Sequence, residues 1–160
     1  MPNAWIINAS PLILFARINQ LELFEKLAPQ IHIPSAVMEE VRDGLPKDAT
    51  ANRALAWAKA YQCADIPIPT SVERWDLGAG ETQVISHCLT GNFWAVLDDR
   101  MARRCINAHN LQMIGSLGVV LRAKDRGFIE TAKPWVYRLR EAGMYASDDL
   151  IHQALLALGE

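Results

Sequence analysis

Short, largely apolar segments alternate with longer amphipathic ones along this chain, and that alternation restricts the folds open to it. Segments 4–7, 31–33, 66–69, 93–97 and 112–114 are too brief for helices, so we expect them to form buried strands. Helical patterns separate them over the first 127 residues. Strands alternating with helices predict a three-layer α/β/α sandwich with a central, mostly parallel sheet of four or five strands.

Local signals predict where several elements begin. Ser10 followed by Pro11 is typical of a helix start, with Ser10 as the N-cap. Thr50 and Ser147 are expected to cap later helices, and residues 45–49 are expected to form a polar loop. Prolines flank and interrupt the segment 66–69, which favours an edge position in the sheet.

Length and composition indicate a single domain spanning residues 1–160, with a core at about 4–127 and C-terminal helices within 134–158. No apolar run approaches the ~20 residues that a membrane helix needs, and the N-terminal segment lacks the basic start of a secretory signal. The three cysteines have no CxxC spacing, which favours neither a disulfide framework nor a zinc site. We therefore expect a cytoplasmic protein without membrane contact.

Acidic and amide side chains are expected at one end of the sheet. Asn8 ends the first strand, Glu40 lies on the helix after the second, Glu81 begins a later helix, and Asp98 and Asp99 end the apolar strand 93–97. Ligand sites of open α/β sheets lie at the carboxyl ends of the strands. Clustered carboxylates either take up protons or bind a cation, and oxygen ligands favour Mg²⁺ or Mn²⁺.

Basic residues are concentrated between residues 100 and 140, although the whole chain has a net charge of −2. That segment holds nine lysine and arginine residues against two acidic ones. Four of them, Arg100, Arg103, Arg104 and Lys124, are candidates for contacts to RNA phosphates, and a solvated helix face is the alternative. Trp75 is the tryptophan that we expect to stack on a base.

Four motifs in order resemble a known family: INASPLI, IPSAVMEEV, LGAGETQVI and AVLDDRMAR. Together they look like the PIN-domain fold, in particular the PIN-like proteins related to VapC-type toxins of toxin–antitoxin pairs. The similarity spans roughly residues 4 to 127. It implies a metal-dependent ribonuclease with an acidic quartet, an antitoxin protein as partner, and Mg²⁺ or Mn²⁺ as cofactor.

The resemblance carries the family's residues over position by position. The second acid matches Glu40 rather than Glu39, the third matches Glu81 and the fourth matches Asp99. The serine that commonly follows the first acid matches Ser10, which we place with the RNA-contacting residues.

The chain departs from the pattern at the first acid, where Asn8 stands. An asparagine keeps an oxygen that can bind metal but removes a negative charge, which weakens cation binding and water activation. Asp98 stands where the family often has a hydroxyl residue or a second acid, and it is a candidate to supply the missing charge. PIN-like proteins with asparagine here resemble a distinct subgroup.

The sequence is compatible with two other functions. A PIN-like module that binds RNA or an antitoxin without cleaving RNA is the first alternative. A receiver-like phosphoacceptor domain, suggested by the Asp98–Asp99 pair, is the second. Each site residue also has a purely structural interpretation, such as Asp99 as a helix N-cap. The C-terminal helices are expected to provide packing or the contacts of a homodimer.

Overall fold

A five-stranded sheet forms the centre of the computed structural model, which describes residues 1–44 and 49–160. Its strands are β1 (Ala4–Ile7), β2 (Ile31–Pro34), β3 (Gln62–Cys63), β4 (Phe93–Val96) and β5 (Gln112–Ile114). The helices are α1 (Ala9–Arg17), α2 (Glu22–Leu27), α3 (Ser35–Asp43), α4 (Thr50–Ala58), the 3-10 turn η1 (Lys59–Tyr61), α5 (Thr70–Glu73), α6 (Ala79–Cys88), α7 (Arg100–Ala108), α8 (Ser116–Asp125), α9 (Lys133–Glu141) and α10 (Asp148–Ala157). The strand order is β3-β2-β1-β4-β5, and all neighbouring pairs are parallel.

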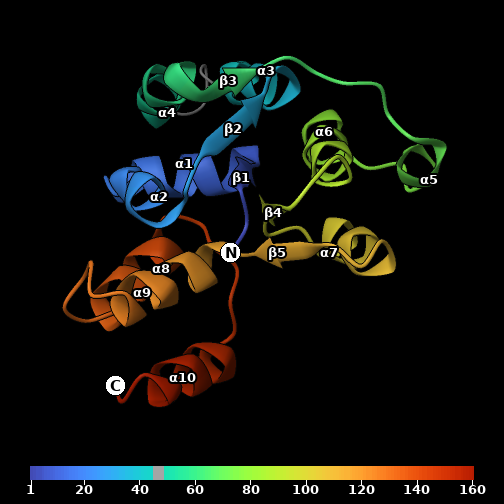
Figure 1. The fold of residues 1–160 in the computed structure, drawn as a ribbon. Helices are drawn as coiled ribbons and strands as arrows, with labels where there is room; N and C mark the ends of the chain where they lie inside the picture. Colours follow the sequence, from blue (N-terminus) through green and yellow to red (C-terminus); the bar gives the residue numbers. More distant parts are fainter. Residues whose placement is uncertain (45–48) are drawn as a thin grey trace.

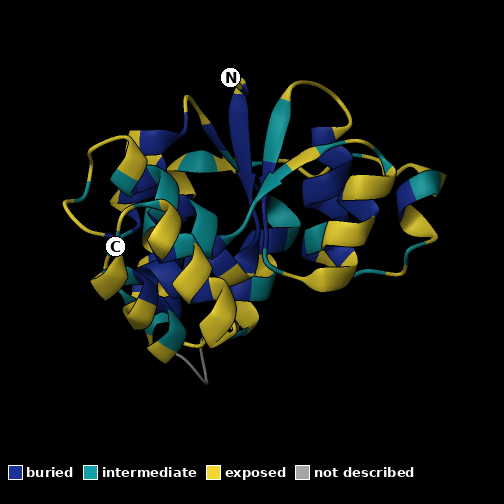
Figure 2. Ribbon diagram, turned by 90° about the horizontal axis from the view of Figure 1, so that it is seen from below, coloured by how far each residue is buried: buried dark blue, intermediate teal, exposed yellow. Residues whose placement is uncertain are grey.

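Helices cover both faces of the sheet, which confirms the predicted α/β/α architecture. Helices α6 and α7 lie on one face, and α1, α2 and α8 lie on the other, with α9 and α10 beyond α8 (Figure 1). Figure 2 shows the strand next to the N-terminus, β1, in the dark blue of buried residues, with further buried residues on the inner sides of the helices. Strands shielded on both faces are apolar throughout, which explains the short apolar runs of the sequence.

The pairing of β1 with β4 forms the middle of the sheet. All four residues of β1 are buried, and Trp5 lies opposite Trp94 in the register of the two strands. Their rings stack with centroids 6.1 Å apart, and the guanidinium of Arg122 lies 5.0 Å from the Trp94 ring centroid. Aromatic stacking therefore adds to the apolar burial that holds these two strands together, and the cation–π attraction joins α8 to β4.

The chain reverses its direction of travel across the sheet between β1 and β4. It proceeds from β1 through β2 to β3 on one side and from β4 to β5 on the other. Asn8 follows β1, and Asp98 and Asp99 come shortly after β4. The backbone N–H of Asn8 donates to the carbonyl of Val96 over 3.0 Å, which fixes these two strand ends side by side. Such a reversal opens a crevice at the carboxyl ends of the two strands.

The predicted strand at residues 66–69 is wrong. The edge strand is β3, Gln62–Cys63, which pairs with β2. The peptide groups of Ile66 instead bond to a side chain: Gln83 accepts from its N–H at 3.0 Å and donates to its carbonyl at 2.8 Å. Gln83 thus satisfies both peptide groups of Ile66 in place of a neighbouring strand.

The expected helix starts are right at one position and wrong at two. The Ser147 hydroxyl accepts from the N–H of Leu150 and caps α10, as expected. In α1, however, Asn8 occupies the N-cap position and Ser10 lies inside the helix, while Thr50 is the first residue of α4 rather than its cap. Of the predicted loop over 45–49, residues 45–48 lie outside the described part of the chain.

Two expectations from composition can be compared with the structure. Among the described residues, none of the helices has both the length and the apolar character to cross a membrane. The thiols of Cys63, Cys88 and Cys105 are free, and two of them are buried.

Candidate functional site

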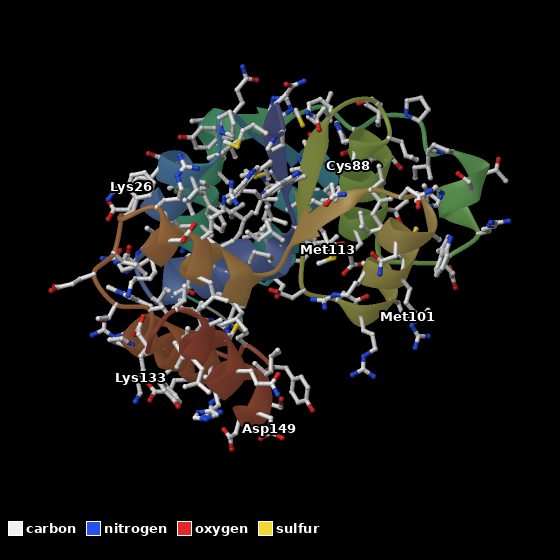
Figure 3. The ribbon with its side chains drawn as sticks, turned by 60° about the horizontal axis from the view of Figure 1, so that its bottom comes forward. Lys26, Cys88, Met101, Met113, Lys133 and Asp149 are labelled. Atoms are coloured by element: carbon white, nitrogen blue, oxygen red, sulfur yellow. The ribbon has the colours of Figure 1, made fainter. Side chains whose placement is uncertain are left out.

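A cavity of about 770 Å³ opens at the carboxyl ends of β1 and β4. Its walls come from distant parts of the chain: the start of α1, the start of α6, the turn into α7, and the connection from α9 into α10. In Figure 3, α7 is marked by Met101 and α10 by Asp149, both on the lower side of the molecule. The lining residues are Asn8, Ser10, Leu14, Glu81, Asp98, Asp99, Arg100, Arg103, Gly143, Met144, Tyr145, Ala146, Ser147 and Leu150.

Asn8 lies in the floor of this cavity and is only 2% exposed. Its backbone conformation is extended, and its side chain makes no capping bond to α1. The side-chain amide hydrogen-bonds to the carboxylate of Glu81, so the amide N–H is the donor. The other amide atom, Oδ1, is buried without a hydrogen-bond partner. A buried acceptor left unpaired is costly, and a ligand at this point would remove the cost.

Glycines at the start of α6 allow two carboxylates to lie against its first turn. Glu40 Oε1 accepts the N–H of Gly80 at 2.7 Å. A Cβ on Gly80 would lie 2.6 Å from Glu40 Oε2, and one on Gly78 would lie 2.7 Å from Glu81 Oε2. No larger residue fits at either position while the carboxylates stay in place. Glu39, by contrast, faces solvent and pairs with Arg42 at 2.7 Å.

The charge state of Glu81 reflects this crowding. Partial burial raises the pKa of its carboxyl above the ordinary value, and the negative charges of Glu40 and Asp99 raise that pKa further. Hydrogen bonds from the backbone of Gly78 and the side chain of Asn8 act in the opposite direction and lower it. The ionised carboxylates therefore repel one another, and a cation placed among them would be attracted by all three.

Asp98 hydrogen-bonds to Ser116, the first residue of α8. Its Oδ1 accepts the N–H of Ser116 at 2.7 Å and its Oδ2 accepts the Ser116 hydroxyl at 2.6 Å. A Cβ on Gly115 would lie 3.2 Å from Asp98 Oδ1, so a glycine precedes Ser116. Asp98 thus satisfies the start of α8 from outside that helix, while still contributing to the cavity lining.

Asp99 is both the N-cap of α7 and one of the acidic residues at the cavity. Its Oδ2 accepts the N–H of Ala102 at 2.9 Å, which makes it the N-cap of α7. The residue is exposed, lines the cavity, and is close enough to Glu81 to raise the pKa of that carboxyl. A capping carboxylate has a second oxygen, so both roles are compatible.

The structure separates the predicted cationic residues into two sets. Arg100 and Arg103 line the cavity, and Ser10 does so too. Arg104 and Lys124 do not: the Arg104 guanidinium lies 3.9 Å from a methionine sulfur, and Lys124 forms an ion pair of 3.3 Å with Glu160.

The side-chain oxygen atoms at the cavity are of the chemical type that binds a hard divalent cation. Within residues 1–44 and 49–160, no three His, Cys, Asp or Glu side chains are arranged closely enough to form a ready-made metal centre. The oxygens that converge on the cavity are nevertheless the type that Mg²⁺ and Mn²⁺ prefer. The unpaired Oδ1 of Asn8 and the mutual repulsion around Glu81 are both features that a bound cation would relieve.

The sequence motifs did not identify the wall contributed by the C-terminal region. Residues 143–147 and Leu150 line the cavity, although they lie outside the motifs that resemble the family. No periodicity marks them, because their contribution depends on how α9 and α10 pack. Trp75, which we expected to stack on a base, is partly buried against the hydrophobic core and is not among the lining residues.

Comparison with known proteins agrees with the fold. No protein of curated function matches the chain significantly. A family model described as a PIN domain matches residues 4–160, which includes α9 and α10. PIN domains have a nuclease-type fold and generally use divalent metals. The match covers nearly the whole chain, and the chain therefore belongs to the PIN-domain family.

Proposed function

We propose that this protein is a cytoplasmic endoribonuclease that depends on Mg²⁺ or Mn²⁺ and forms the toxin half of a toxin–antitoxin pair. The observation that carries the proposal is the environment of Glu81. Its carboxylate meets the amide of Asn8 and the charges of Glu40 and Asp99 at the reversal point of the sheet. This combination of converging oxygens and a raised pKa is typical of a functional site.

Four side chains would hold the cation: Asn8 through its unpaired Oδ1, and Glu40, Glu81 and Asp99 through carboxylate oxygens. When bound, such a cation polarises a phosphodiester and lowers the pKa of a coordinated water. Gly78 and Gly80 keep space for two of these carboxylates and donate N–H groups that orient them.

Arg100 and Arg103 are the groups that bind the substrate in this proposal. Both are exposed on α7, and both line the cavity beside the carboxylates. Their guanidinium groups would hold the phosphates of an RNA strand, while the acidic floor would orient the phosphodiester next to the cation. Ser10 adds a hydroxyl at the same wall.

The proposed partners rest on the resemblance to VapC-type toxins. An antitoxin protein is the expected inhibitor. For the homodimer, the C-terminal region offers exposed apolar side chains, with Leu156 60% and Leu150 50% exposed on α10.

A second function is favoured by Asn8. With an amide in place of a carboxylate, the site has one negative charge fewer, and the Asn8 amide hydrogen-bonds to Glu81, one of the proposed ligands. A PIN-like module that binds RNA or an antitoxin with little or no cleavage would retain every other contact.

Cleavage assays on single-stranded and structured RNA separate these functions. The wild-type protein is incubated with Mg²⁺, with Mn²⁺ and with a chelator, beside Glu81→Gln and Asn8→Asp. A ribonuclease cleaves RNA with either cation, stops with chelator, and loses activity in Glu81→Gln. Arg104→Ala is the matched control, because Arg104 is exposed on α7 but does not line the cavity.

The outcome with Asn8→Asp decides between the two functions. If the wild-type protein is inactive and Asn8→Asp cleaves RNA, the non-catalytic module is correct. Cleavage by the wild-type protein that persists in the chelator and in Glu81→Gln would contradict the metal-dependent mechanism.

A further inference from the structure

Tyr145 lines the cavity, yet almost no other side chain packs against it. It is 94% exposed, more than any other large hydrophobic residue reported for the described chain. Aromatic rings of this size usually bury most of their surface, and they provide base-stacking platforms in proteins that bind single strands. The exposed ring of Tyr145 is therefore available to stack on a ligand of the cavity.

The backbone around Tyr145 is held at both ends. On one side Met144 is buried, and its N–H donates to the carbonyl of Leu139 at 3.0 Å. On the other side Ser147 caps α10, and Asp148 pairs with Arg140 across the connection. The ring consequently projects from a fixed stretch of chain, and ordering it on a ligand costs the rotation of only two side-chain torsions.

The same cavity has a cationic part. Arg100 and Arg103 line it together with Tyr145, as do the carboxylates of Glu81 and Asp99. A strand whose phosphates meet the arginines can turn a base toward the tyrosine only if that base is unpaired. In an A-form duplex the base faces are stacked inside the helix and are not accessible.

We infer that Tyr145 is a specificity-determining residue that stacks on an unpaired base of an RNA strand bound at Arg100 and Arg103. The inference rests on the proposed function, because it takes RNA as the ligand of the cavity. It goes beyond that function by selecting single-stranded over duplex substrate through one named side chain.

Three substitutions separate stacking from other contributions. Tyr145→Phe keeps the aromatic face and removes the hydroxyl, Tyr145→Leu keeps apolar surface without an aromatic face, and Tyr145→Ala removes both. Phe128→Ala is the matched control, since Phe128 is an exposed aromatic residue, 39% exposed, that does not line the cavity.

Binding is measured by fluorescence anisotropy in EDTA, where metal-dependent cleavage is suppressed. The probes are a short labelled single-stranded RNA and a blunt duplex of the same sequence. Tyr145→Ala should weaken single-strand binding by roughly ten-fold, as expected for the loss of one stacked base. Tyr145→Phe and Phe128→Ala should stay near wild type, Tyr145→Leu should fall between, and duplex affinity should not change.

A second readout reports the stack directly. In single strands carrying the fluorescent base 2-aminopurine at successive positions, wild type should quench one position, and Tyr145→Ala should abolish that quenching. Equal single-strand affinity of Tyr145→Ala and wild type, an equal loss for the duplex, or no RNA binding by wild type would each overturn the inference. Loss of affinity without any RNA cleavage by wild type would refute the proposed nuclease activity and leave the stacking role supported.

Discussion

The side-chain amide of Asn8 hydrogen-bonds to the carboxylate of Glu81, while the Oδ1 atom of the same amide is buried without a partner. Asn8 follows β1 and Glu81 lies on α6, and the two residues meet where the chain reverses across the sheet. At this position an aspartate would add a fourth charge to a crowded group of carboxylates. The asparagine instead supplies a donor, which makes the ionised form of Glu81 more tolerable in the absence of a cation.

Ionisation of Glu81 should destabilise the metal-free protein. Because burial and neighbouring charges raise its pKa in the folded state above the ordinary value of 4.5, the folded chain binds this proton more tightly than the unfolded chain. The resulting stability is fully present below pH 4.5 and is lost as the pH rises through the folded pKa. Thermal unfolding in EDTA should show Glu81→Gln gaining stability relative to wild type across that window. Parallel curves for the two proteins would contradict the raised pKa.

Gly80→Ala should destabilise the protein by about 1–3 kcal/mol, because its Cβ would lie 2.6 Å from Glu40 Oε2. The cost depends on the glutamate, so the double variant Glu40→Ala, Gly80→Ala tests its origin. In the Glu40→Ala background the same change should be neutral or stabilising by up to ~1 kcal/mol, since alanine favours helix. Urea denaturation of wild type, the two single variants and the double variant measures the coupling free energy between Glu40 and Gly80. Equal effects in both backgrounds would mean that Gly80 is needed for another reason.

Ser116→Ala should lower the free energy of unfolding by about 1 kcal/mol, because the Ser116 hydroxyl bond of 2.6 Å to Asp98 is lost. The backbone bond from Ser116 to Asp98 remains. If Asp98 mainly supports α8, Mn²⁺ should stabilise Ser116→Ala as much as it stabilises wild type in a thermal shift assay. A strong loss of that Mn²⁺ effect, with unchanged stability in EDTA, would instead place Asp98 among the cation ligands.

Arg103→Ala should reduce the salt dependence of RNA binding. Removing one phosphate contact to a single strand lowers the slope of log K against log salt by ~0.7. Arg104→Ala should leave the slope near its wild-type value, because Arg104 does not line the cavity. Anisotropy titrations at several salt concentrations provide the measurement, and equal slopes for the two variants would show that the cavity does not select between these neighbours.

Much of the fold could be predicted because parallel strands covered on both faces must be apolar. The runs that became β1 and β4 are short and hydrophobic, and four of the five expected strands lie where their sequences indicated. The edge strand escaped prediction because β3 has two residues, Gln62 and Cys63, and no apolar pattern. The proline-flanked segment beside it resembled a strand, but Gln83 satisfies the backbone of Ile66 there.

The site could be predicted only in part. Residues next to strand ends could be predicted, and residues placed by the packing of the C-terminal helices could not. Residues at strand ends, such as Asn8 and Asp99, are placed by topology alone, which a sequence pattern can reveal. The position of Tyr145 depends instead on how α9 and α10 pack against the rest of the molecule, and no local signal encodes that packing. The same holds for the separation of Arg103 from Arg104, which depends on the rotation of α7 about its axis.

The adjacency of β1 and β4 has a consequence for when the candidate site can form during synthesis. Residues 4–7 pair with residues 93–96, so the middle of the sheet closes only after synthesis has passed residue 96. Asn8 and Asp99 cannot approach one another before that event. A ribosome-bound fragment that ends before β4 would thus lack the cavity, and under the proposed function it could not cleave RNA.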